Sequence, residues 1–127
     1  MAENNSKREE FSNIQLNDTE RMANELCEKF ETRFKEKIDN CEIFDVVDEP
    51  SHRAFKIRFE AYNYFIILFN YDLDRMGCSI EYGKYYISLE NSQRWYSGAH
   101  FNAFFDEFQK EVELRIPDKF LEDRGWK

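Results

Sequence analysis

Glycine, proline and histidine are scarce in this chain, whose 127 residues include four glycines, two prolines and two histidines. Backbone that cradles phosphate groups depends on glycine-rich turns, so the composition argues against a phosphate-binding loop. Neither His52 nor His100 has a neighbour at the spacing of a metal ligand or a catalytic base, and no GxSxG or HExxH motif occurs. We therefore expect a protein without enzyme activity, metal or cofactor.

Cysteine is also rare, since only Cys27, Cys41 and Cys78 are present and no CxxC pair occurs. An odd number at these spacings argues against a disulfide framework and against an ordinary zinc site, so we expect reduced thiols that pack as small core residues. The first residues lack the apolar segment of a secretory signal, which predicts a cytoplasmic location. No apolar run is long enough for a membrane-spanning helix.

Positive charge is in deficit, because 18 lysines and arginines stand against 26 acidic residues, for a formal net charge of −8. Binding to nucleic acid needs a basic surplus that neutralises phosphates, and anionic membranes require the same surplus. The sequence therefore predicts neither a nucleic-acid partner nor a membrane partner. An acidic surface suits either solubility or a basic protein partner.

A calcium loop is the nearest approach to a metal motif, because Asp72 and Asp74 occupy its first and third positions. Its fifth position is Met76, and its twelfth, which requires a bidentate glutamate, is Gly83. The segment is better interpreted as a turn rich in aspartate.

Two amphipathic helices and a run of strands account for most of the chain. Asn17 and Glu20 have the spacing of a capping box, which predicts the start of a helix of about six turns that ends at Asp39–Asn40. Its apolar stripe recurs every four residues: Met22, Leu26, Phe30, Phe34 and Ile38, joined by Ala23, Cys27 and Cys41. A second helix, capped by Ser97 and ended by Pro117, has its own stripe: Phe101, Phe104, Phe105, Phe108 and Val112.

Between the helices, alternating and continuous apolar patterns predict strands near residues 42–48, 55–60, 62–71, 78–82 and 85–89. Their short connections require a mostly antiparallel sheet. The fold class is therefore α+β, in the order α-β-β-β-β(-β)-α, with four to five strands and both helices packed on one face. Residues 1–16 are expected to form a mobile arm, and residues 17–127 a single domain.

Two details stay open at this level. The third strand is apolar on both faces, so a two-residue turn at Tyr62–Asn63 and a three-residue turn would send opposite side chains inward. At Gly83–Lys84 the alternation changes parity, which favours a tight hairpin but also fits a bulge in one long strand. Either arrangement would keep the apolar side chains of both segments on one inward face: Cys78, Ile80, Tyr82, Tyr85, Ile87 and Leu89.

Aromatic residues provide the best indication of function. Tyrosine and tryptophan gather near carboxylates around two strand connections, a composition typical of protein-recognition surfaces. The predicted partner-binding residues are Asp72, Asp74, Glu81, Tyr82, Tyr86, Trp95 and Tyr96.

In size, acidity and order of elements the chain resembles the small immunity proteins that bacteria pair with secreted toxins, including those of contact-dependent inhibition systems. The resemblance implies a non-enzymatic module that binds and neutralises a basic toxin domain. An acidic secretion chaperone, or another dimeric binding protein, is the alternative, since the apolar second face of the third strand would suit an extended partner or a homodimer. A small enzyme of unknown type is the third interpretation.

Overall fold

The first helix begins where its capping box predicts. In the computed structural model, which describes residues 16–127, helix α2 spans Asp18–Phe34. The Asn17 side chain accepts a hydrogen bond from the Glu20 backbone N–H (2.7 Å), and the Glu20 carboxylate accepts one from the Asn17 N–H (3.0 Å). The arm predicted for residues 1–16 lies outside the described residues except for Leu16.

The predicted end of this helix is wrong by about five residues. At Lys35 the backbone turns to φ 52°, a single 3₁₀ turn follows over Lys35–Lys37, and Ile38 opens the first strand. Ile38 is still buried, because it now pairs with Ala61 across the sheet. The four-residue spacing of apolar residues therefore continues from Phe34 to Ile38, although the helix has ended and Ile38 belongs to a strand.

Five strands form one antiparallel sheet in sequence order, which confirms the predicted fold class. Each strand pairs with the next through a short connection, so the sheet is a simple meander. The strands are β1 (Ile38–Glu49), β2 (His52–Ala61), β3 (Phe65–Asp72), β4 (Arg75–Tyr82) and β5 (Tyr85–Ser88).

Two bulges interrupt the pairing of β1 with β2, one between Asp39 and Glu42 and one between Phe44 and Val47. Each contains one residue with positive φ, Asn40 (56°) and Asp45 (53°), and these two residue types tolerate that conformation better than most. The residue after each, Cys41 and Val46, packs against the core.

The two open questions about turns are settled by the register. Ala61 pairs with Phe65, so three residues form the β2–β3 loop and Ile67, Phe69 and Tyr71 face the core. Tyr82 pairs with Tyr85, so Gly83 (φ 61°) and Lys84 form the tight hairpin that the parity change favours. The expected single inward face holds for Cys78, Ile80 and Leu89 only, because Tyr82, Tyr85 and Ile87 are exposed.

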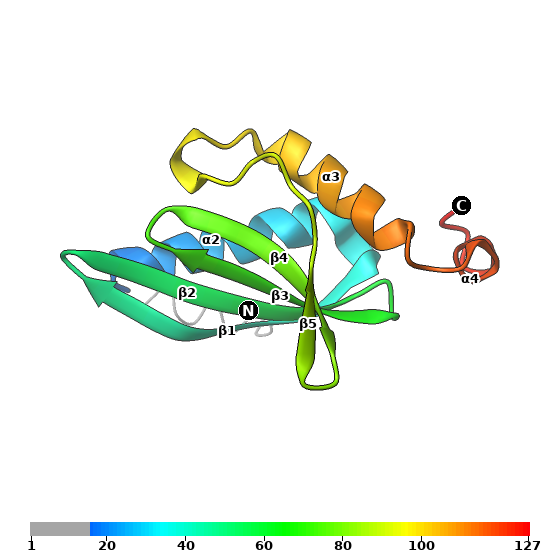
Figure 1. Ribbon diagram of the computed structural model, residues 1–127, viewed down its shortest axis with the longest axis horizontal. Helices are drawn as coiled ribbons and strands as arrows, with labels where there is room; N and C mark the ends of the chain where they lie inside the picture. Colours follow the sequence, from blue (N-terminus) through cyan, green and yellow to red (C-terminus); the bar gives the residue numbers. More distant parts are fainter. Residues whose placement is uncertain (1–15) are drawn as a thin grey trace, which may run out of the picture.

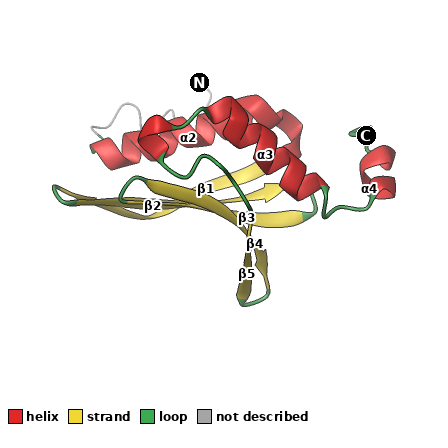
Figure 2. Ribbon diagram, turned by 45° about the horizontal axis from the view of Figure 1, so that its top comes forward, coloured by secondary structure: helices red, strands yellow, loops and turns green. Residues whose placement is uncertain are grey.

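Both long helices cover the same face of the sheet, as expected (Figure 2). Helix α3 spans Phe101–Glu113, and a short helix α4 (Asp118–Asp123) follows Pro117. His100, not Ser97, precedes α3, and Ser97 lies in a separate 3₁₀ turn over Tyr96–Gly98. Figure 1 shows α2 running in much the same direction as β1 and β2, with α3 inclined to it.

Phe30 is the centre of the core between helices and sheet. Its ring is fully buried and lies 4.8 Å from Phe59, 5.0 Å from Phe105 and 5.6 Å from Phe108, centroid to centroid. The rings are tilted or edge-on, the arrangement that aromatic quadrupoles favour. The predicted stripes of both helices therefore meet at one residue.

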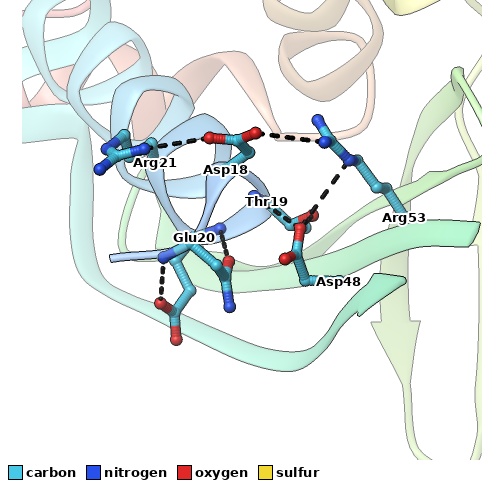
Figure 3. A network of polar contacts seen from close by, with 7 residues as sticks. Asp18, Thr19, Glu20, Arg21, Asp48 and Arg53 are labelled. Carbon is cyan, nitrogen blue, oxygen red and sulfur yellow. Dashed lines mark hydrogen bonds and ion pairs between the residues drawn. The ribbon is translucent and has the colours of Figure 1, made fainter. Parts of the chain in front are cut away.

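A polar network joins the start of α2 to the β1–β2 hairpin (Figure 3). The buried Thr19 donates hydrogen bonds to the Asp48 carboxylate from its hydroxyl (2.6 Å) and from its backbone N–H (3.3 Å). The Arg53 guanidinium forms ion pairs with the carboxylates of Asp18 (3.2 Å) and Asp48 (3.8 Å). Thr19 thereby satisfies one of the unpaired N–H groups of the first helical turn with a carboxylate from another element. Of the helices in residues 16–127, none combines the length and apolar content needed to cross a bilayer.

Candidate protein-binding surface

The face of the sheet opposite the helices is not covered by any described element (Figure 2). Its side chains alternate with the core residues along the central strands, and we call this set the open sheet face. Its members are Phe44, Lys56, Arg58, Glu60, Ile66, Leu68, Asn70, Ser79, Glu81 and Tyr86. Ile66 is 42% exposed, and Leu68 and Phe44 are half-buried.

Arg58 contacts two other residues of the open sheet face, Glu81 and Phe44. Its Nε lies 2.7 Å from a carboxylate oxygen of Glu81, and its guanidinium lies 4.9 Å from the Phe44 ring centroid. The hydrogen bond that Arg58 donates to the Glu81 carboxylate, with a smaller contribution from Tyr86, raises the pKa of Arg58 above its usual value. Glu81 is therefore already paired within the chain, which reduces its availability to a basic partner.

The β4–β5 hairpin carries the most exposed aromatic side chains of the described chain. Tyr82 is 70% exposed, Tyr85 66%, Tyr86 52% and Ile87 41%, and we call these four residues the hairpin patch. The hairpin extends away from the sheet on the side opposite the helices (Figures 1 and 2). Tyr86 pairs with Glu81 and so also belongs to the open sheet face, whereas Tyr82, Tyr85 and Ile87 lie on the other face of the hairpin.

Four of the predicted residues lie at the other end of β4. The Asp74 carboxylate accepts hydrogen bonds from the Ser97 N–H (3.0 Å) and hydroxyl (2.8 Å), so it holds the loop before α3. Tyr96 lies between Tyr71 and Phe101, with ring centroids 5.3 and 5.5 Å away, and its burial raises its pKa. Asp74 and Tyr96 therefore have structural roles.

Asp72 and Trp95 are the accessible members of this second group. The Asp72 carboxylate lies at hydrogen-bond distance from the His52 ring, with 3.0 Å between Asp72 Oδ1 and His52 Nε2. Trp95 is 54% exposed, with the Arg75 guanidinium 5.3 Å from its ring centroid. Seven strand steps separate Arg75 from Tyr82, which places this group roughly 23 Å from the hairpin at about 3.3 Å per residue.

The structure thus divides the seven predicted residues into two clusters. Glu81, Tyr82 and Tyr86 lie together at the hairpin, and the other four lie around the β3–β4 turn: Asp72, Asp74, Trp95 and Tyr96. Sequence reasoning missed Tyr85 and Ile87, because their alternation predicted a core-facing strand. It also missed Arg58 and Phe44, although the two-sided apolar character of the third strand did point to the open sheet face.

An open hollow of about 980 Å³ lies beside β4, between the part of its edge that β5 does not cover and the segment that leads to α3. Two of its polar residues are engaged with each other, since the Glu107 carboxylate accepts hydrogen bonds from the Ser92 N–H (2.7 Å) and hydroxyl (2.6 Å). These bonds lower the pKa of Glu107, which keeps it a carboxylate. These bonds fasten the loop that contains Ser92 to Glu107 of α3.

Metal-binding geometry is not found in the part of the chain that the structure describes, where no three His, Cys, Asp or Glu side chains are grouped to hold an ion. Comparisons of the chain with models of known protein families, with curated proteins and with solved structures find no match. The candidate site is therefore defined by its geometry alone, which is a group of exposed aromatic side chains on a projecting hairpin beside the open sheet face.

Proposed function

We propose that this chain is a protein-binding module that holds its partner on the hairpin patch and the adjoining open sheet face. The observation that carries the proposal is the exposure of three tyrosines and an isoleucine on one projecting hairpin. Tyrosine is enriched at interfaces because its ring provides apolar area at little entropic cost and its hydroxyl pairs at the rim. A hairpin that stands clear of the body can enter a concave partner surface.

Charge supports a basic partner. The net charge of −8 produces a field that attracts a lysine- and arginine-rich surface over several ångströms and speeds association. A basic toxin domain, as in the immunity proteins that the chain resembles, fits both the charge and the aromatic patch. In this proposal the module neutralises the toxin by covering its active site.

Affinity capture from the source organism tests the proposal with a matched pair of variants. Tyr82→Ser/Tyr85→Ser removes two rings from the hairpin patch, and Leu114→Ser removes an equally exposed side chain, 70% accessible, at the end of α3. We expect the double variant to lose the captured partner and Leu114→Ser to retain it. Capture that is equal for the parent and both variants contradicts the hairpin as the interface.

The captured protein also separates the alternatives. A folded basic domain whose activity stops when the module is added supports the immunity function. An unfolded secreted segment supports the chaperone alternative, for which the open sheet face is the favoured contact. Turnover of a small molecule by the isolated chain would support an enzyme instead.

A further inference from the structure

Two cysteine sulfurs from different elements lie in contact beneath the sheet edge. Cys41 Sγ donates to Cys27 Sγ at a distance of 2.9 Å. Cys27 belongs to the buried stripe of α2, and Cys41 lies in β1. A disulfide bond is about 2.05 Å long, so the two sulfurs need to approach by less than about 1 Å to form one.

The first bulge of β1 creates this contact. Without the extra residue between Asp39 and Glu42, the side chain at position 41 would alternate onto the open sheet face. The positive φ of Asn40 (56°) turns Cys41 toward α2, where it packs against the core. The pairing of the sulfurs is therefore a consequence of a specific backbone irregularity.

Accessibility gives the two sulfurs different roles. Cys27 is fully buried, whereas Cys41 is partly exposed, so a soluble reagent should react first with Cys41. Cys78, the third cysteine, lies buried on β4, and burial raises the pKa of its thiol, which keeps it in the unreactive protonated form.

We propose that Cys27 and Cys41 are a redox-active dithiol that a small-molecule disulfide, such as glutathione disulfide, converts to an intramolecular disulfide between α2 and β1. The Cys41 thiolate attacks one sulfur of the reagent, forming a mixed disulfide and releasing one glutathione thiolate. The Cys27 thiolate then attacks Cys41 Sγ and releases the second glutathione. Both cysteines lose their protons and, together, two electrons, which reduce the reagent to two thiols.

The crosslink would fasten the helix to the bulged edge of the sheet. It closes a loop of about 15 residues, and a loop of that size restricts the unfolded chain enough to lower the unfolding equilibrium constant on the order of 100-fold. Reduction reverses the change. The stability of the helix–edge contact therefore depends on the thiol–disulfide ratio of the surroundings.

Intact-mass and peptide analysis test the proposal on the full chain in native buffer. After incubation with glutathione disulfide we expect a loss of about 2 Da, from the two hydrogens removed, and a crosslinked peptide that contains Cys27 and Cys41. Dithiothreitol should restore the original mass. Cys41→Ser should abolish the crosslink, whereas Cys78→Ser should retain it.

Denaturant titration of the oxidised and reduced protein provides the second readout. The oxidised protein should need more denaturant, in line with the 100-fold lower unfolding constant, and Cys41→Ser should show no difference between the two conditions. A stable glutathione adduct on Cys41, an unreacted dithiol, or a crosslink that forms only in denaturant would overturn the proposal. None of these readouts depends on the binding partner.

Discussion

Tyr62 shows how a single turn residue can connect three parts of the molecule. Its backbone has a φ of 61°, which is unfavourable for a bulky side chain, yet its side chain is fully buried. The hydroxyl donates to the Glu113 carboxylate at 2.7 Å, and the ring lies edge-on to Trp126 at 5.5 Å. The β2–β3 loop thereby holds the end of α3 and the C-terminal segment.

We expect Tyr62→Phe to lower the free energy of unfolding by about 1.5–3 kcal/mol, the usual range for a hydrogen bond to a charged group. Tyr62→Ala should cost more, about 3–5 kcal/mol, because it also leaves a cavity. Urea denaturation measures both, with the exposed Tyr64→Phe as control. A change at Tyr62→Phe no larger than at Tyr64→Phe would show that the Glu113 contact does not stabilise the fold.

At the scale of elements, the attachment of α2 to the β1–β2 hairpin depends on an ionised carboxylate. Three contacts lower the pKa of Asp48 below its ordinary value of 3.8. The largest effect comes from the hydrogen bond donated by the Thr19 hydroxyl, and smaller ones come from the Thr19 backbone N–H and the positive charge of Arg53. In the unfolded chain these bonds are absent. Asp48 therefore contributes stability above its ordinary pKa, and that contribution is lost as the pH falls through the lower folded-state value.

This linkage predicts the effect of Asp48→Asn at different pH values. At neutral pH the variant should be less stable than the parent, because an amide is a weaker acceptor for Thr19 than a carboxylate. As the pH falls below 3.8 and through the lower folded-state pKa, Asp48 of the parent also becomes protonated, so the difference between the two should shrink. Urea midpoints measured from pH 7 down to pH 2.5 test this, and a difference that is constant across the series would contradict it.

The elements that sequence patterns predict well are those that local periodicity determines. The capping box at Asn17, the tight turn at Gly83 and the antiparallel order of the strands all follow from neighbouring residues. The helix end at Phe34 and the bulge at Asn40 do not, because they require positive φ at Lys35 and Asn40, residues with no glycine signal. Because Ile38 follows Phe34 by four residues, its spacing still fits a helix, so the apolar pattern did not indicate the end of the helix at Phe34.

The candidate site was predicted less completely for a related reason. Nearness in sequence grouped Trp95 with Tyr82, but the extended β4 separates the segments that carry them. Exposure of Tyr85 depends on how far the β4–β5 hairpin extends past the helices, which is a property of the whole sheet. The sequence pattern places these rings on a strand, and only the tertiary arrangement leaves them exposed.

At the scale of the whole molecule, the ring contacts around Phe30 join both helices to the central strands. Phe30→Ala and Phe108→Ala should each lower the free energy of unfolding by about 3–5 kcal/mol. Since α2 and α3 share this core, fluorescence and far-ultraviolet circular dichroism should report the same transition in both variants. Separate transitions by the two probes would show that the helices unfold independently.

The separation of the two aromatic clusters makes the proposed interface testable at single residues. If the partner is held on the hairpin patch, Tyr85→Ala should weaken binding by about 2 kcal/mol, roughly 30-fold, mainly through faster dissociation. Trp95→Ala, which removes another exposed ring at the far end of β4, should leave affinity within about twofold, as expected of a residue outside the contact.

Ionic strength separates the charge contribution from the aromatic one in the same kinetic experiment. Because the field of the −8 charge acts before contact, added salt should slow association of the parent and of Tyr85→Ala in parallel, and leave dissociation nearly unchanged. Surface-immobilised partner and stopped-flow mixing across a salt series provide both rates. If Trp95→Ala loses affinity while Tyr85→Ala keeps it, the interface lies at the β3–β4 turn, and the hairpin patch has another role.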